Sequence, residues 1–273
     1  MFAQSPLILF FALAFAIAWI IWVAIALLIP DLSPGAGTFI TIPGSWAPTL
    51  AALLIAGRLE GREGVRSLVR GLIVWRVGVQ WYFIAIFGPI LVAALAVAIH
   101  VLLGGTPPDI ETIAAGLNLP SEEANFFVLV IMFPIVFLML CFGGPLAEEI
   151  GWRGFAQPRL QALIGPGLAG LTIGIIWSLW HLPLLGLVPS ATGQIPLWGY
   201  LLRTTAFGVV FAWLYNRTGQ SVLLCLLLHA GLNTLWAFGL TTITQDTQLM
   251  VLFMILVGLA TIWAYVSLTR VED

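Results

Sequence analysis

Long apolar runs without charge are the feature that most constrains this chain. Runs of eighteen or more such residues, about the length that crosses a bilayer as a helix, recur along the whole sequence. Of the 273 residues, 61% are hydrophobic and 8% are charged, whereas an average soluble domain is about a quarter charged. So little polar surface cannot coat a water-soluble globule, which excludes a soluble enzyme, a nucleic-acid-binding protein and a disordered chain.

The apolar runs are bounded by Gly, Pro or charged residues, and they predict eight membrane spans. We expect helices, because a helix satisfies its own backbone polar groups in lipid and the runs lack the alternation of barrel strands. The predicted fold class is all-α, a polytopic transmembrane helical bundle, with residues 1–273 forming a single integral-membrane domain. The expected spans are about 7–29, 39–57, 78–103, 126–142, 166–186, 197–215, 220–239 and 248–268.

The arginines predict the orientation of the bundle. Five of them follow the second expected span within residues 58–76, whereas the loop after the third span carries four acidic residues within 109–123 and no cation. Since cytoplasmic loops are enriched in cations, nine of the ten arginines and both termini are expected in the cytoplasm, with the protein in the cell (inner or plasma) membrane. The exception is Arg203, near the outer end of the sixth span, where it could reach the interface or pair with a carboxylate.

Ionisable side chains within apolar sequence are candidates for function, because each costs roughly 2.5 kcal/mol or more at the centre of a span. The first cluster is Glu148-Glu149 with Arg153, directly after the fourth span. On a helix, Glu149 and Arg153 are four residues apart and share a face, so we expect an ion pair. Glu148 points about 100° away and is left without a local partner, which makes it a candidate general base.

Two more polar clusters lie on later spans. Trp177 and His181 fall near the end of the fifth span, and His229 and Asn233 are one turn apart on one face of the seventh. Together with a carboxylate, two imidazoles and a carboxamide can orient a water, take its proton and donate hydrogen bonds to a developing oxyanion. This combination of groups is typical of a hydrolase.

Two non-catalytic roles for these polar residues stay open. Intramembrane His and Asn commonly form interhelical hydrogen bonds, so a non-catalytic membrane immunity or scaffold protein is one alternative. A transporter or proton channel is the second, although most of the remaining spans have no polar face to line a path. His100, Cys141 and Cys225 are expected to be buried structural residues.

Several familiar motifs are missing or incomplete. The sequence has no HExxH and no GxSxG, and no aspartate falls within an expected span, so zincin, serine-hydrolase and intramembrane aspartyl-protease chemistry lack their residues. The run 165–170 formally matches GxGxxG but follows no strand, and we interpret it as a loop with close helix packing.

In order along the chain, Glu148-Glu149 with Arg153, Trp177 with His181, and His229 with Asn233 resemble the motifs of the CPBP family. This family of intramembrane proteases is the CAAX-prenyl-protease and bacteriocin-processing group, also called Abi. Its motifs are Glu-Glu-x-x-x-Arg, aromatic-x-x-x-His and His-x-x-x-Asn/Asp. The second usually carries Phe where this chain has Trp177. The match covers about 143–235, within an expected motif-bearing core of about 126–240.

The resemblance implies an intramembrane endopeptidase that cleaves a peptide or membrane-associated protein substrate near the cytoplasmic face. Glu148 with His181 would activate the attacking water, and His229 and Asn233 would stabilise the oxyanion. Glu149, paired with Arg153, and Trp177 would be supporting residues. No cofactor is favoured, but zinc is possible. Such a metal would be held by Glu148, His181 and His229, with an open position for water.

One geometric condition must be met for this site to form. At 1.5 Å per residue, His181 would lie roughly 20 Å deeper than Glu148 if the fourth and fifth spans were straight helices entering from the same surface. A break at Gly143-Gly144-Pro145, or a fifth helix that starts below the bilayer surface, is needed to bring the two side chains together. Non-helical backbone is tolerated at such a depth where it lines a water-filled cavity.

Overall fold

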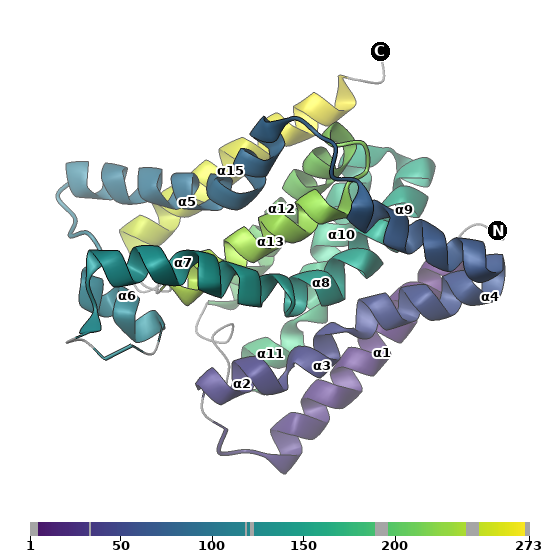
Figure 1. The fold of residues 1–273 in the computed structure, drawn as a ribbon, viewed down its shortest axis with the longest axis horizontal. Helices are drawn as coiled ribbons and strands as arrows, with labels where there is room; N and C mark the ends of the chain where they lie inside the picture. Colours follow the sequence, from purple (N-terminus) through teal and green to yellow (C-terminus); the bar gives the residue numbers. More distant parts are fainter. Residues whose placement is uncertain are drawn as a thin grey trace.

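The structure is a computed structural model that describes residues 5–32, 34–117, 119–120, 123–188, 196–238 and 246–270. Within these ranges the chain is helical, without strands (Figure 1). A π-helical segment, Ile150–Ala156, joins α8 to α9, and a 3₁₀ turn, Gly71–Ile73, follows α4. The α-helices are α1 (Ser5–Leu28), α2 (Pro34–Ile40), α3 (Ile42–Ser45), α4 (Ala47–Arg70), α5 (Val79–Leu102), α6 (Ile110–Gly116), α7 (Phe126–Cys141), α8 (Gly144–Glu149), α9 (Gln157–Ile164), α10 (Pro166–Trp180), α11 (Leu182–Gly186), α12 (Leu197–Arg217), α13 (Val222–Ala237) and α15 (Thr247–Thr269).

The helices α10, α12 and α13 form the centre of the bundle. Helices α1 and α4 pack together on one side, and α5 and α15 on the other (Figure 1). Helix α7 packs on α13, and α8 with the π-helical segment packs on α4. This arrangement confirms the predicted all-α helical bundle.

Within the described residues, five helical stretches are long and apolar enough to cross a membrane: 6–28, 79–102, 126–164, 197–217 and 247–269. The apolar helices α10 and α13 are shorter. Large apolar side chains point outward, such as Leu27 at 76% exposure and Leu102 at 85%, as expected of lipid-facing positions. The chain is therefore a multi-pass membrane protein.

Each of the eight expected spans overlaps a helix of the structure. Because five stretches of the described residues are long and apolar enough to cross a membrane, the span count of eight stays a prediction. The second span differs most from expectation. Residues 39–57 are divided among the end of α2, the short α3 and the first part of α4. Pro43 and Pro48 stand at the starts of α3 and α4, where the missing N–H of proline is tolerated. A second half of α4 rich in arginine then follows a kink at Gly61.

Glycines allow α10 and α12 to approach closely. A methyl group on Gly174 would collide with the backbone of Thr205, and one on Gly208 would collide with the backbone of Gly174. Gly165 has a φ of 78° at the turn before α10, and a methyl on Gly170 would meet Ala212 on α12. The run 165–170 is thus a loop followed by close helix packing, as predicted.

A break between α7 and α8 positions the first polar cluster. Helix α7 ends at Cys141, Gly143 takes a non-helical conformation (φ −83°, ψ −128°), and α8 begins at Gly144 with Pro145 in its first turn. The break falls at the predicted Gly143-Gly144-Pro145 run. Both cysteines, Cys141 and Cys225, are free and buried, as expected.

Replacing Gly174 by Ala should destabilise the protein, because the new methyl group would push α10 away from the backbone of α12. Overpacking of this kind costs about 1–3 kcal/mol. The matched control is Gly258→Ala on α15, whose methyl group would meet nothing within 4 Å and should leave stability equal or slightly higher. Thermal unfolding in detergent measures both, and equal melting temperatures would contradict the close packing.

Candidate active site

The two adjacent glutamates lie at the end of α8 and are buried, Glu148 at 4% exposure and Glu149 at 0%. A π-helical turn follows them, a backbone form that is often found at functional sites. Gly144 faces the Glu148 carboxylate, since a methyl group there would lie 3.2 Å from Oε1. The absence of a side chain at position 144 leaves this carboxylate room.

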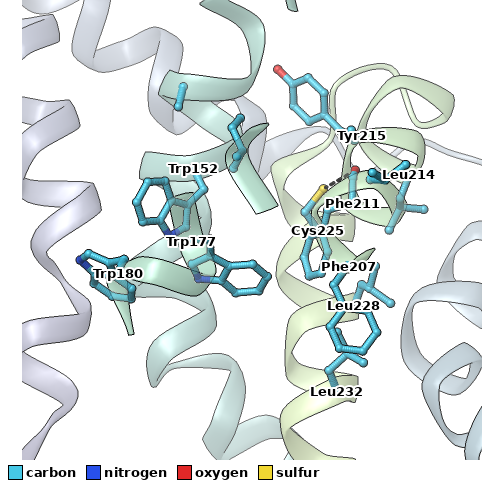
Figure 2. Close-up of a cluster of buried hydrophobic side chains, with 14 of the residues drawn as sticks. Trp152, Trp177, Trp180, Phe207, Phe211, Leu214, Tyr215, Cys225, Leu228 and Leu232 are labelled. Carbon is cyan, nitrogen blue, oxygen red and sulfur yellow. Dashed lines mark hydrogen bonds between the residues drawn. The ribbon is translucent and has the colours of Figure 1, made fainter. Parts of the chain in front are cut away.

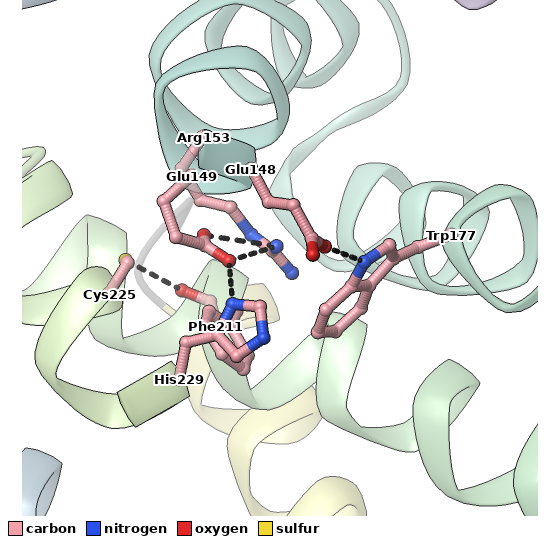
Figure 3. Close-up of polar contacts among 7 residues, drawn as sticks. All are labelled: Glu148, Glu149, Arg153, Trp177, Phe211, Cys225 and His229. Atoms are coloured by element: carbon pink, nitrogen blue, oxygen red, sulfur yellow. Dashed lines mark hydrogen bonds and ion pairs between the residues drawn. The ribbon is translucent and has the colours of Figure 1, made fainter. Parts of the chain in front are cut away.

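Glu149 accepts hydrogen bonds from two other side chains (Figure 3). Arg153 Nη1 lies 3.1 Å from each carboxylate oxygen, which confirms the predicted ion pair. His229 Nδ1 lies 2.8 Å from Oε1, a contact between α8 and α13 that the sequence did not reveal. The Arg153 guanidinium also stacks on Phe211 at 4.1 Å and on Trp177 at 4.9 Å. The charge of Glu149 is thus compensated inside the bundle.

Glu148 accepts its hydrogen bond from Trp177 (Figure 3). The indole Nε1 lies 2.7 Å from Oε2 and joins α10 to α8. The sequence predicted Trp177 only as a supporting aromatic residue of the second motif. In this structure its N–H directly holds the candidate base, a bond that a phenylalanine could not make.

The hydrogen bonds of the two histidines define which ring nitrogen carries a proton. His181 Nδ1 lies 2.9 Å from the Trp177 carbonyl, which can only accept, so this nitrogen is the donor. In neutral His181 the other nitrogen, Nε2, then has a free lone pair. His229 Nδ1 donates to Glu149 in the same way, so His229 must carry both ring protons if its Nε2 is also to donate.

Trp177 brings the predicted clusters together. Its ring centroid lies 5.9 Å from that of His181 and 5.2 Å from that of His229. In the described part of the chain no hydrogen bond joins Glu148 directly to His181 or His229, although Trp177 contacts all three side chains. Asn233, one turn after His229 on α13, is partly buried and makes no hydrogen bond to the described residues.

Tryptophans from α1 support the His181 end of α10, which the motifs did not predict. Trp22 stacks against His181 at 6.1 Å and packs against Trp180 at 4.6 Å. Trp180 Nε1 donates to the carbonyl of Ala14, and Trp19 Nε1 donates to the carbonyl of Trp180. Figure 2 shows Trp152, Trp177 and Trp180 gathered in the buried core. None of the sequence motifs indicated these contacts.

Two residues of α12 also border the site. The Tyr200 ring lies 5.7 Å from that of His181, and the Arg203 guanidinium lies over Tyr200 at 5.2 Å and over Trp236 at 4.0 Å. Arg203 is 7% exposed and forms no ion pair with a described carboxylate. The sequence offered two environments for Arg203, the interface or a carboxylate, and the structure gives it aromatic faces instead.

The predicted zinc ligands do not converge on one point. Among the described residues, no three His, Cys, Asp or Glu side chains gather closely enough to hold a metal ion. Two of the three predicted ligands are turned to other partners, Glu148 to Trp177 and His229 to Glu149. As arranged here, these residues do not fit a metal ion.

The fold and this site define a class: a multi-pass helical membrane protein with a buried carboxylate and two histidines. Comparison with known proteins shows which proteins the chain is similar to. Residues 130–235 match the family described as Rce1-like, Type II CAAX prenyl endopeptidase. The chain is also 25% identical to "CAAX prenyl protease 2" of Methanococcus maripaludis over 258 residues, 90% of each chain. The predicted resemblance to the CPBP, or CAAX protease, family is thus confirmed over this part of the chain.

Replacing Arg153 by Met should be severely destabilising, because it leaves the Glu149 carboxylate without its guanidinium. Breaking a buried pair costs about 3–5 kcal/mol, whereas an exposed pair contributes about 0–1 kcal/mol. The matched control is Arg159→Met on α9, since Arg159 pairs with Glu60 at the surface. Unfolding in detergent measures both variants, and similar stability losses would contradict a structural role for the Glu149–Arg153 pair.

Proposed function

We propose that this chain is an intramembrane endopeptidase that cleaves a peptide bond by glutamate-activated attack of water near the cytoplasmic membrane face. The observation that carries the proposal is the buried Glu148 carboxylate, held by Trp177 within a ring of aromatic and histidine side chains. The similarity to CAAX prenyl proteases supports a peptidase. The adjacent carboxylate, Glu149, already accepts hydrogen bonds from Arg153 and His229. Glu148 is therefore the carboxylate that can act as the base.

The activation step uses Glu148 and His181. A water between them donates a proton to the carboxylate or to the free lone pair of His181 Nε2, while its oxygen attacks the peptide carbonyl carbon. The carbonyl π bond opens to an oxyanion, and the carbon–nitrogen bond then breaks as the stored proton passes to the leaving amine. The hydrogen bond from His181 Nδ1 to the Trp177 carbonyl supports this role, because it leaves Nε2 as the acceptor.

The oxyanion is stabilised by donors from α13. The Asn233 amide has no other described partner and can donate to the developing charge. His229 contributes from Nε2 when both ring nitrogens are protonated, and its hydrogen bond to Glu149 fixes the plane of the ring. The three motifs thus supply a base on α8, a base at the end of α10 and donors on α13.

The substrate is a peptide or membrane-associated protein segment that reaches the site from the lipid or the cytoplasmic side. The relative's name specifies a CAAX prenyl substrate for that protein. A farnesylated peptide ending in a CAAX sequence is accordingly the first candidate here. Unprenylated peptides form the second set, because comparing the two sets shows whether cleavage requires the prenyl group.

Replacing Glu148 by Gln should reduce cleavage by about 10²- to 10⁴-fold, because the amide keeps the shape of the side chain but cannot take a proton. The measurement is the hydrolysis of quenched fluorescent peptides, including a farnesylated CAAX peptide, by detergent-purified protein with and without chelator. The control is Glu63→Gln, an exposed glutamate on α4, which should keep full activity.

We expect the chelator to have no effect. Loss of wild-type activity on chelation would overturn metal-independent chemistry and favour a metal held by Glu148, His181 and His229. A folded Glu148→Gln variant with full activity would contradict the proposed base. A folded wild type that cleaves no peptide in the set would favour the non-catalytic scaffold alternative.

Replacing Trp177 by Phe should lower kcat/KM by about tenfold to a hundredfold, because a hydrogen bond to a charged group contributes about 1.5–3 kcal/mol. The family usually carries Phe at this position, so the fold should tolerate the change. The control is Trp263→Phe on α15, which is 59% exposed. Equal activity of wild type and Trp177→Phe would show that the indole N–H does not position Glu148.

A further inference from the structure

Arg203 is a buried cation whose hydrogen-bonding groups are unused. It lies within α12, one of the apolar helices, and is 7% exposed. In the described part of the chain it makes no hydrogen bond or ion pair, and its Nε is fully buried without a partner. Arg153, buried in the same bundle, is paired with Glu149. A guanidinium left unpaired inside a span is costly, which makes Arg203 a candidate for binding an anion.

Aromatic rings hold the guanidinium in place without using its donors. It lies 4.0 Å from the centroid of Trp236 and 5.2 Å from that of Tyr200. Cation–π contacts of this kind engage the flat face of a guanidinium and leave its N–H groups pointing outward in the plane. These N–H groups form the planar fork that binds a carboxylate through two parallel hydrogen bonds.

Arg203 also lies next to the reacting groups. Tyr200 contacts both the Arg203 guanidinium and the ring of His181. Trp236 follows Asn233 by three residues, so the two lie on neighbouring positions of one face of α13. The unused guanidinium therefore lies beside the site, separated from His181 by a single aromatic ring.

We propose that Arg203 binds the C-terminal carboxylate of the substrate and so directs cleavage to a bond close to the end of the peptide. This inference rests on the proposed peptidase function. Every linear peptide with a free end carries this carboxylate, and an extended chain advances about 3.3 Å per residue. One ring separates Arg203 from His181, so the bound terminus lies a few residues beyond the cleaved bond. An acidic side chain near the end of the peptide is the other group that could supply a carboxylate to Arg203.

The test compares one cleavable peptide in three forms: a free C-terminal acid, a C-terminal amide, and an amide whose last residue is replaced by Glu. The enzymes are wild type, Arg203→Gln and Arg203→Lys. We expect wild type to cleave the acid with a kcat/KM at least about tenfold above that of the amide, the scale of a charged hydrogen bond. Arg203→Gln should cleave acid and amide equally, and Arg203→Lys should keep part of the preference.

Two results would overturn the proposal: a wild type without preference between acid and amide, or an Arg203→Gln variant that keeps the full preference. A Glu-ended amide cleaved better than the free acid would overturn the terminal carboxylate in favour of a side chain. If Arg203→Gln fails to fold, the wild-type and Arg203→Lys comparisons still decide the matter.

A binding measurement separates failure of this inference from failure of the proposed function. The Glu148→Gln protein, which should not turn over, is titrated with the acid and amide peptides, and so is Glu148→Gln combined with Arg203→Lys. We expect tighter binding of the acid by at least about tenfold, reduced in the double variant. If wild type cleaves no peptide but the acid still binds more tightly than the amide, the result contradicts the proposed peptidase function and not the role of Arg203. If the peptides are cleaved but the acid is not preferred, the result contradicts the role of Arg203 and not the peptidase function.

Discussion

The site depends on the buried carboxylate of Glu149 and its two partners. A charged carboxylate can be retained inside a bundle only where it is paired and hydrogen-bonded, and Arg153 and His229 supply both conditions. The same contacts join α8, the π-helical segment and α13, and they set the orientation of the His229 ring. Because Glu149 takes these partners, the adjacent Glu148 is left with one neutral donor, Trp177. Two neighbouring carboxylates thus acquire different environments, the usual basis for different chemical roles.

The sequence predicted the parts of the site that depend on local geometry. Glu149 and Arg153 lie one helical turn apart, so their pairing follows from the helix period. The break at Gly143-Gly144-Pro145 was one of two arrangements that the depth argument offered, because straight helices would have kept Glu148 and His181 apart. The contact between Glu149 and His229 could not be predicted in this way, since it depends on how α8 and α13 are rotated against each other.

The N-terminal half contributes to the site through features that leave no motif. The three motifs and the family match lie within residues 130–235, yet Trp22 of α1 stacks on His181 and packs against Trp180. Such contacts require bulky aromatic rings at suitable depths but no fixed spacing, so no sequence motif indicated them. Pro43 and Pro48 did signal that the second expected span would be divided. The span was predicted as continuous because the prediction followed the apolar content of residues 39–57.

The cations inside the bundle differ in a way that bears on catalysis. Arg153 is neutralised by Glu149 within the folded protein, so its charge stabilises structure and is not available to a ligand. Arg203 rests on the faces of Trp236 and Tyr200 and forms no hydrogen bond or ion pair with the residues that the structure describes. An anion that pairs with Arg203 would release free energy at a point removed from the cleaved bond. Binding energy from a part of the substrate that does not react can hold the peptide in the orientation that attack on its carbonyl requires.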